Sequence, residues 1–283
     1  MDQKANRISV VMCTYNGALY LKEQLDSIMN QTYPAWEVII FDDCSTDDTS
    51  AIIQSFAQRY PSIKFRENTH RMGVQANFAA VISEAKGDYI ACCDQDDVWM
   101  PFKLERLLEV VGNNKDVLVC SDAYLIDNKG QVMSNSFFKE YGFKTNLSLG
   151  EYILKDNNVT GCTMMFASSL KEKLYPFPMH YYYHDRWLGI VASVYGKIIF
   201  CEDKLIGYRQ HETNVSATLG GGGHDALDQK YFWEKAKGLW FMIMNCRKLK
   251  YGTSVFIRLI KDFICACVGL SLLKSMWLRT KNT

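Results

Sequence analysis

Three aspartates, Asp94, Asp96 and Asp97, lie within four residues at the end of an apolar run that has the length of a buried strand. Carboxylates this close repel one another unless a cation or a basic side chain lies between them. Oxygen ligands of this kind suit Mg²⁺ and Mn²⁺, which often share their coordination with a substrate diphosphate. The alternative is a solvated acidic turn in which Asp97 caps the following helix. The spacing alone leaves both interpretations open.

Polar side chains also follow the two apolar runs nearest the N-terminus. Thr14, Tyr15 and Asn16 come after the first run, and Asp42 and Asp43 end the second. In an open parallel sheet, ligands bind beyond the carboxyl ends of the strands. If these runs are parallel strands, the sequence therefore predicts one cleft lined by these loops and by the three aspartates.

The first hundred residues have the alternation that such a cleft requires. We expect strands at 8–14, 36–41, 63–66 and 88–94, and helices at 18–30, 48–59 and 74–84. Near-continuous apolar strands separated by amphipathic helices are typical of βαβ units and of a mostly parallel sheet covered by helices on both faces. The predicted fold class is α/β.

The pattern is looser after residue 101. It predicts a helix at 102–111, a strand at 117–126, a strand at 158–167 interrupted by Gly161, and a helix within 181–195 that opens with His184 and Asp185. Two short strands are expected at 197–201 and 204–210. Four consecutive glycines, 220–223, then predict a flexible loop, and the residues from 226 onward are expected to be helical.

The composition is that of an ordinary globular protein. The 283 residues are 48% hydrophobic and 22% charged, with a net charge of +1, which excludes a disordered or collagen-like chain and disfavours a general nucleic-acid binder. None of the ten cysteines forms a C-x-x-C pair of the kind that binds zinc. The N-terminus has no apolar stretch of signal-peptide length, so we expect reduced, structural cysteines in a cytoplasmic protein.

Many separated segments resemble the family 2 glycosyltransferases, which have the GT-A fold. They are VVMCTYNGALYLKEQLDSIMNQTYPAWEVIIFDDCSTDDT (10–49), RMGVQANF (71–78), GDYIACCDQDDVWMPFKLE (87–105), GCTMMF (161–166), HDRWL (184–188) and YRQHETNVS (208–216). The loop D-Q-D-D-V-W and the last two segments are similar to the rhamnosyltransferase-like branch, which builds bacterial surface polysaccharides. The resemblance implies a GT-A domain at 1–215, with a nucleotide-binding half at about 1–100 and an acceptor half at about 101–215.

The resemblance also implies roles for individual residues on the donor side. Contacts to the nucleotide are expected from Thr14, Tyr15, Asn16, Asp42, Ser45, Arg71, Asn77, Asp94 and Arg209. A carboxylate such as Asp42 can accept the N3–H of uracil or thymine, although Asp42 could instead cap a helix. Arg71 departs from the asparagine common at its position. Arg209 is expected to supply positive charge to the leaving diphosphate.

A divalent cation, Mn²⁺ or Mg²⁺, is expected to be held by Asp96, with Asp94 and His211 as further metal contacts. In the family such a cation stabilises the charge of the leaving diphosphate. Asp185 matches the general base that takes the proton of the acceptor hydroxyl in an inverting displacement, although it could also serve only as a helix cap. Residues expected on the acceptor and sugar side are Trp99, Gly161, His184 and Trp187.

The C-terminal segment differs in charge from the rest of the chain. Residues 247–283 contain eight Lys and Arg and one acid, beside an apolar stripe of helical spacing. This pattern predicts a lid at the glycine run and then a basic amphipathic tail across 216–283, which would lie on the cytoplasmic face of an anionic inner membrane. The alternative is a helix packed on the catalytic domain or on a second subunit, as in a homo-oligomer.

The expected reaction is therefore transfer of a sugar from dTDP-rhamnose or a UDP-hexose to a glycan acceptor, carried on a polyprenyl lipid, in O-antigen, capsule or exopolysaccharide assembly. No nucleic-acid partner is expected. A sugar nucleotidyltransferase would need a glycine-rich basic loop after the first strand, and CTYNGALYL has one glycine and no basic residue. The third possibility is a non-catalytic, membrane-bound scaffold of polysaccharide assembly.

Overall fold

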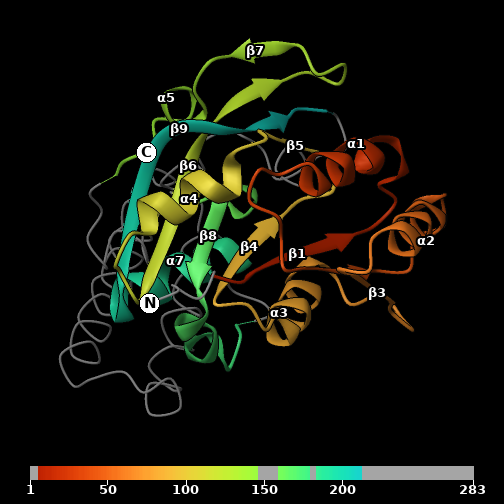
Figure 1. Ribbon diagram of the computed structural model, residues 1–283, viewed down its shortest axis with the longest axis horizontal. Coiled ribbons are helices and arrows are strands. Elements are labelled where there is room, and N and C mark those ends of the chain that lie inside the picture. The colour runs from red at the N-terminus through yellow and green to blue at the C-terminus, as the bar shows by residue number, and fades with distance from the viewer. Residues whose placement is uncertain (1–5, 146–158, 179–182, 212–283) are drawn as a thin grey trace, which may run out of the picture.

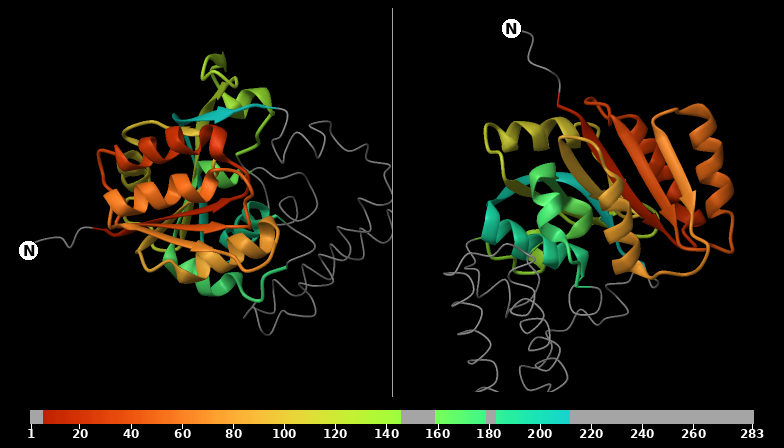
Figure 2. Two further views of the ribbon diagram at one scale, coloured as in Figure 1. Left: turned by 90° about the vertical axis from the view of Figure 1, so that its right-hand side faces the viewer. Right: turned by 90° about the horizontal axis from the view of Figure 1, so that it is seen from below.

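The structure is a computed structural model in which residues 6–145, 159–178 and 183–211 are described. These residues form a nine-stranded sheet in the order β3-β2-β1-β4-β8-β6-β9-β5, with β7 paired to β6 (Figure 1). Helices lie on both sides of this sheet, as Figure 2 shows from two further directions. The α/β class and the covered central sheet are confirmed.

The first half of the sheet is parallel. Strands β1 (Ile8–Thr14), β2 (Glu37–Asp42), β3 (Ile63–Glu67) and β4 (Tyr89–Cys93) alternate with helices α1 (Ala18–Met29), α2 (Thr49–Arg59) and α3 (Val74–Glu84). Strand β1 pairs in parallel with both β2 and β4, and β2 pairs in parallel with β3. The carboxyl ends of β1, β2 and β4 therefore lie at one edge, as the sequence predicts.

The second half of the sheet adds antiparallel pairings to the parallel set. Strand β8 (Met164–Ala167) lies between β4 and β6 (Val117–Ile126) and runs antiparallel to both. The two-residue strand β5 (Val98–Trp99) is antiparallel to β9 (Lys197–Arg209), and β7 (Val132–Ser134) is antiparallel to β6. The remaining helices are α4 (Lys103–Val111), α5 (Phe137–Glu140) and α7 (His184–Tyr195), with a 3₁₀ segment at Ser168–Leu174.

Two expected elements differ from the structure. The two short strands predicted at 197–201 and 204–210 are one strand, β9, whose register against β6 shifts around Asp122. The irregular register accommodates the polar residues between the two apolar runs without ending the strand. The strand predicted at 158–167 begins instead as a 3₁₀ turn, Gly161–Thr163, and becomes β8 only at Met164.

The core consists of two apolar clusters, one on each face of the sheet. On β1, Val11 belongs to the cluster under α3 and α7, whereas Val10 and Met12 belong to the cluster under α1, α2 and α4. This follows from the geometry of a strand, in which successive side chains point to opposite faces. Burial on both faces explains why the strands read as continuous apolar runs.

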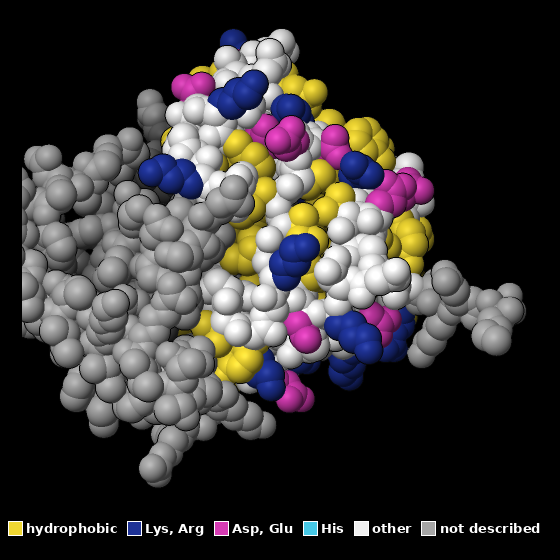
Figure 3. Space-filling view, turned by 90° about the vertical axis from the view of Figure 1, so that its left-hand side faces the viewer, with side chains coloured by type: hydrophobic (Ala, Val, Ile, Leu, Met, Phe, Trp, Pro, Cys, Tyr) yellow, Lys and Arg dark blue, Asp and Glu magenta, His cyan; other side chains and the backbone are white. Residues whose placement is uncertain are grey.

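On the described part of the face in Figure 3, Lys and Arg side chains lie among Asp and Glu rather than in a patch of one sign. No helix among residues 6–145, 159–178 and 183–211 has the length and apolarity needed to cross a bilayer. The predicted lid at 220–223, the domain boundary at 215 and the basic tail lie outside the described residues.

Candidate active site

Side chains and backbone groups tie together the loops that follow β1, β2 and β4. The backbone N–H of Tyr15 donates to Gln95 Oε1 at 2.9 Å, and Gln95 Nε2 donates back to the Tyr15 carbonyl at 3.1 Å. The backbone N–H of Asn16 donates to Ser45 Oγ at 2.8 Å. The convergence of the three loops is therefore present in the structure.

Asp42 is fully buried at the end of β2. Its Oδ1 accepts hydrogen bonds from Thr14 Oγ1 at 2.7 Å and from Ser45 Oγ at 2.6 Å, and its Oδ2 accepts from the Ser45 N–H at 2.7 Å. A carboxylate with three donors inside the protein fixes the neighbouring loops. This differs from the direct contact with the nucleotide base that the resemblance implies for Asp42, and Thr14 is buried with it.

Arg71 and Asn77 have different environments. The guanidinium of Arg71 lies 3.7 Å above the ring centroid of Tyr15, and both side chains are exposed. Asn77 is buried, and its Nδ2 donates to the carbonyl of Phe41 at 3.1 Å while its Oδ1 accepts from Asn68. Arg71 and Tyr15 are thus available to a ligand, whereas Asn77 fastens the end of β2 to α3 and is not placed for the expected ribose contact.

Asp43 is a structural residue to which the sequence analysis assigned no role. Its Oδ1 accepts from the Met72 N–H at 2.7 Å and its Oδ2 accepts from the Gly73 N–H at 2.9 Å. These bonds fix the segment that carries Arg71 into α3. In the sequence, a role for Asp43 could have been recognised from its place beside Asp42 at the end of an apolar run.

Asp96 and His211 meet at the centre of the site although they are 115 positions apart in the chain. The distance between Asp96 Oδ2 and His211 Nε2 is 2.9 Å, and both side chains are largely buried. The ring of His211 lies 5.0 Å from that of Tyr20 on α1. The structure therefore brings together two of the three residues expected to hold a metal.

Asp94 is partly buried directly after β4, as is Asp96. Burial, followed by the negative charges of Asp96 and Asp185, raises the pKa of Asp94 to about 7. Burial also raises the pKa of Asp97 well above its ordinary value. Among the described residues, one group of three possible ligands has its atoms within 4.8 Å of one another, namely Asp94, Asp97 and Cys162. This group differs from the expected set of Asp94, Asp96 and His211.

Lys103 is a buried cation behind the acidic loop, and the sequence analysis did not select it. Its Nζ donates to the carbonyl of Cys162 at 2.6 Å and lies 3.8 Å from the ring centroid of Trp99. Burial lowers the pKa of Lys103 to about 8, against the opposing charges of Asp97 and Asp94. Lys103 lies on the buried face of α4 with Leu107 and Val111. A lysine at a core-facing position of an amphipathic helix is the sequence pattern that could have indicated a buried cation.

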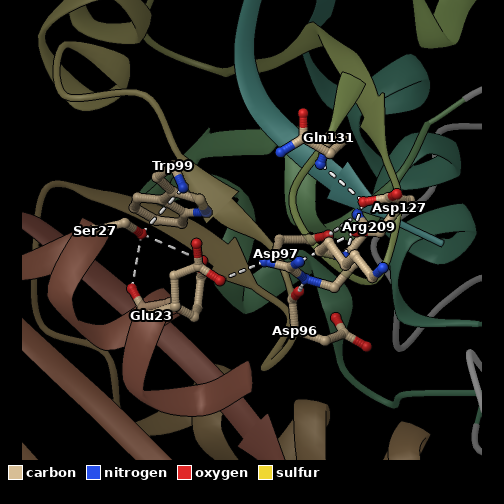
Figure 4. A network of polar contacts seen from close by, with 10 residues as sticks. Glu23, Ser27, Asp96, Asp97, Trp99, Asp127, Gln131 and Arg209 are labelled. Atoms are coloured by element: carbon tan, nitrogen blue, oxygen red, sulfur yellow. Dashed lines mark hydrogen bonds and ion pairs between the residues drawn. The ribbon is translucent and has the colours of Figure 1, made fainter. Parts of the chain in front are cut away.

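Arg209 is 1% exposed, and its guanidinium is bound within the protein. Nε donates to the Asp96 carbonyl at 2.7 Å, Nη1 to the Asp127 carbonyl at 3.2 Å, and Nη2 to Glu23 Oε2 at 2.6 Å (Figure 4). The resemblance implies that Arg209 contacts the leaving diphosphate. In the structure it supports the acidic loop from behind.

Asp185 lies in the first turn of α7 and is partly buried. Its charge contributes to the raised pKa values of Asp94, Cys92 and Cys120, so its carboxylate lies near the acidic loop and the adjoining strands. The helix N-terminus favours the ionised carboxylate that a general base requires. The expected base thus lies within electrostatic range of Asp94.

His184, next to Asp185, is buried against α3. Its ring stacks on Phe78 with centroids 3.7 Å apart and an angle of 11° between the planes. Burial lowers the pKa of His184 to about 3, so the ring is neutral near pH 7. Gly161 lies under this ring, where an added Cβ would be 2.5 Å from His184 Nε2.

Two tryptophans expected to contact a sugar are core residues instead. Trp187 is fully buried, and its Nε1 donates to the Leu174 carbonyl at 2.8 Å. Trp99 is 2% exposed and lies beneath Lys103. Neither ring presents a face to solvent. The sequence pattern alone could not distinguish a buried indole from one at the mouth of a cleft.

Comparison with known proteins agrees with this architecture. Residues 9–174, more than half of the chain, match Glycosyl transferase family 2. The chain belongs to that family. Membership supports a glycosyltransferase over the nucleotidyltransferase and scaffold alternatives.

Curated relatives of this family 2 glycosyltransferase include a protein of similar length. TuaG of Bacillus subtilis, named as a teichuronic acid biosynthesis glycosyltransferase, is 36% identical over 270 residues, covering 91% of this chain and 96% of TuaG. An uncharacterized glycosyltransferase of Methanocaldococcus jannaschii is 32% identical over 207 residues, covering 71% of this chain and 70% of the relative. The chain spans about two thirds of the length of several other curated relatives.

Solved structures share the fold at low identity. TarS of Staphylococcus aureus (residues 1–349, in complex with UDP-GlcNAc) matches with a TM-score of 0.65 at 17% identity, covering 92% of this chain and 72% of that one. The mannosyltransferase PcManGT of Pyrobaculum calidifontis, in complex with GDP-Man and Mn²⁺, matches with a TM-score of 0.57 at 16% identity, covering 96% and 76%.

The donor atoms of this glycosyltransferase fit a hard divalent cation at Asp96 and His211. The Asp96 carboxylate suits Mn²⁺ or Mg²⁺, which keep other positions for phosphate oxygens and water, and the His211 imidazole favours the transition metal Mn²⁺ over Mg²⁺. Cys162 fits such a cation poorly, because burial raises the pKa of its thiol and a protonated thiol is not a good ligand. The Asp96–His211 pair, with Asp94 behind it, is therefore the candidate metal centre.

Proposed function

We propose that this family 2 glycosyltransferase is an inverting, metal-dependent enzyme that transfers a sugar from a nucleoside diphosphate sugar to a glycan of a cell-surface polysaccharide. The observation that carries the proposal is the 2.9 Å contact between Asp96 and His211, with Asp185 on the adjoining helix close enough to perturb Asp94. The site would combine two side chains that bind a cation with a carboxylate that acts as the base.

Tyr15 and Arg71 would hold the nucleotide base. Both are exposed, and the Arg71 guanidinium already lies 3.7 Å from the Tyr15 ring centroid, so a base could pack against either group. Asn16 and Ser45 would line the ribose side, on loops that Asp42 keeps in place. The donor complexes of TarS and PcManGT contain UDP-GlcNAc and GDP-Man, which supports a nucleotide sugar without selecting one.

Asp96 and His211, with support from Asp94, would hold Mn²⁺ or Mg²⁺. When bound, the cation supplies the positive charge that stabilises the departing nucleoside diphosphate. Mn²⁺ accompanies GDP-Man in the PcManGT structure. The protein's own contribution is to keep the carboxylate of Asp96 within reach of the imidazole of His211.

Asp185 would take the proton of the acceptor hydroxyl. The acceptor oxygen forms a bond to the anomeric carbon as the bond from that carbon to the diphosphate oxygen breaks, and the proton passes to the Asp185 carboxylate. A single displacement inverts the anomeric configuration and requires no second carboxylate as an acid. His184, neutral and packed on Phe78, would fix the start of α7 beside the acceptor.

The proposed acceptor and donor are those expected from the resemblance to the rhamnosyltransferase-like branch. TuaG is named for teichuronic acid biosynthesis, which supports a glycan of the cell surface. The donor would be dTDP-rhamnose or a UDP-hexose, and the acceptor would be carried on a polyprenyl lipid at the cytoplasmic face of the membrane. The basic residues 247–283 would contact the anionic lipid surface.

A panel of nucleotide sugars, incubated with the full chain and Mn²⁺, tests the proposal through release of the nucleoside diphosphate. One donor should release product with an acceptor glycan, and EDTA should stop the release. Asp185→Asn should abolish transfer while retaining metal-dependent nucleotide binding. Full transfer by Asp185→Asn, or activity that EDTA does not change, would contradict the assigned chemistry.

A further inference from the structure

Glu23 and Arg209 form an ion pair between an exposed acid and a buried cation. Glu23 Oε2 lies 2.6 Å from Arg209 Nη2, and the Glu23 side chain is 56% exposed whereas that of Arg209 is 1% exposed. The pair joins α1 to the end of β9, residues 186 positions apart. Figure 4 shows Arg209 between Asp96, Asp127 and the glutamate on α1.

Arg209 contacts the acidic loop of the candidate metal centre through both its side chain and its backbone. Its Nε holds the carbonyl of Asp96 at 2.7 Å, and its backbone N–H donates to Asp97 Oδ1 at 2.9 Å. Arg209 also precedes His211 by two residues at the end of β9. The position of one side chain therefore fixes the backbone of the carboxylate ligand and the strand end that leads to the imidazole.

One face of α1 supports this arrangement. Tyr20, Glu23 and Ser27 are spaced so that they lie on the same side of the helix. The ring of Tyr20 lies 4.6 Å from the Arg209 guanidinium, and Ser27 Oγ accepts from the Trp99 N–H at 3.0 Å. The helix thus contacts both Arg209 and the segment that follows Asp97.

We propose that Glu23 is a positioning residue for the divalent cation, which acts through Arg209 to hold Asp96 and His211 in their binding geometry. The inference rests on the proposed function, because it requires a cation at Asp96 and His211. Glu23 has no expected contact with the nucleotide or the cation.

Two consequences of removing the Glu23 charge should both weaken binding of the cation. Removing the charge of Glu23 leaves a buried guanidinium less compensated, and its positive charge then opposes the binding of a cation close by. The charge-assisted bond that orients the guanidinium also becomes weaker. Loss of an outer hydrogen-bonding partner at a metal site weakens metal affinity by about tenfold or more.

The test measures Mn²⁺ affinity of the full chain from the electron paramagnetic resonance signal of the free ion. Glu23→Gln keeps the length of the side chain and removes its charge. Asp26→Asn is the matched control, because Asp26 lies on the same helix and pairs with Lys22 at 2.7 Å. We expect the dissociation constant for Mn²⁺ to rise about tenfold in Glu23→Gln and to stay at the wild-type value in Asp26→Asn.

A second measurement distinguishes a positioning role of Glu23 from a general loss of structure in the Glu23→Gln variant. The Mn²⁺ concentration that gives half-maximal transfer should rise in Glu23→Gln, whereas kcat at saturating Mn²⁺ should return to within about twofold of wild type. Equal Mn²⁺ affinities in wild type and Glu23→Gln would overturn the inference. Failure of the proposed function gives a different result: Asp96→Asn would then bind Mn²⁺ as wild type does, or the wild-type chain would leave the ion free.

Discussion

His184 lies flat on Phe78, with ring centroids 3.7 Å apart, and this contact joins the helix of the candidate base to α3. Helix α3 is in turn fastened to the end of β2 through Asn77. Helix α7, which carries Asp185, is thus braced against α3 and the end of β2 by a stacked pair of rings. Gly161, under the His184 ring, leaves the space for this stack.

Gly161→Ala should therefore damage catalysis through His184. The new Cβ would lie 2.5 Å from His184 Nε2, so the ring must move and displace the start of α7 with Asp185. We expect a loss of about 1 to 3 kcal/mol in unfolding free energy and a fall in kcat of about tenfold to a hundredfold. Denaturant unfolding and transfer kinetics measure the two effects.

The double variant Gly161→Ala/His184→Ala provides the control. Removing the ring removes the clash, so the alanine at 161 should destabilise the His184→Ala background less than it destabilises the wild type. Equal destabilisation in both backgrounds would mean that His184 does not mediate the effect.

The raised pKa of Asp94 predicts how the metal-free protein responds to pH. The carboxyl titrates at about 7 in the folded chain and at about 3.8 when unfolded, so the folded state retains a proton between these values. Its contribution to stability is therefore present at low pH and is lost as pH rises towards 7, at about 1.4 kcal/mol per pH unit. His184 has the opposite effect, because its pKa is lowered to about 3 and its contribution is lost as pH falls.

The contribution of Asp94 can be isolated with Asp94→Asn. The difference in unfolding free energy between Asp94→Asn and wild type should shift in favour of the variant as pH rises from 4 to 8, measured with chelator present. Mn²⁺ binding by the wild type below pH 7 should also release a proton, which calorimetry in two buffers detects. A difference that does not change with pH would exclude the raised pKa.

Lys103→Met should be tolerated better in acid than in base. The variant removes the buried ammonium behind Asp94 and Asp97 and keeps the volume of the side chain. At pH 8 Asp94 is largely ionised and Lys103 is about half protonated, so Asp94 loses a partial compensating charge, and we expect a loss of about 1 to 3 kcal/mol in unfolding free energy. At pH 5 Asp94, with a pKa of about 7, is largely protonated, so the loss should be smaller. Equal losses at both pH values would contradict this role.

Trp187→Phe should change stability and leave acceptor recognition intact. The buried indole donates to the Leu174 carbonyl, and the variant leaves that carbonyl without this donor. We expect a loss of about 1 to 3 kcal/mol in unfolding free energy, with an unchanged KM for the acceptor. A large rise in the acceptor KM without loss of stability would return Trp187 to the sugar-binding role that the sequence suggested.

The elements and the position of the site could be predicted because they depend on local patterns. The bounds of β1 and α3 agree with the predicted 8–14 and 74–84, since apolar runs and helical spacing are visible within a short window. Strand ends also place polar loops at one edge, which accounts for the meeting of the loops after β1, β2 and β4. The proximity of Asp96 and His211 was expected only from the resemblance.

The environments of single side chains could not be predicted, because they depend on packing between distant segments. Arg209 is the expected residue in the expected strand, yet its guanidinium is bound by Asp96 and Glu23 rather than being free for a phosphate. Trp99 and Asn77 are buried for the same kind of reason. Glu23 gives no signal at all in the sequence, since an exposed glutamate on a helix is ordinary.

Among the strands of the described residues, β9 is the last to be synthesised, and it leads to His211. The parallel strands β1 to β4 can pair while the ribosome is still adding later residues, but the imidazole arrives 115 residues after Asp96. At ordinary translation speeds this is a delay of about 6 to 23 s. During that interval the nascent chain has the loops after β1, β2 and β4 without His211, so the contact between Asp96 and His211 cannot yet form.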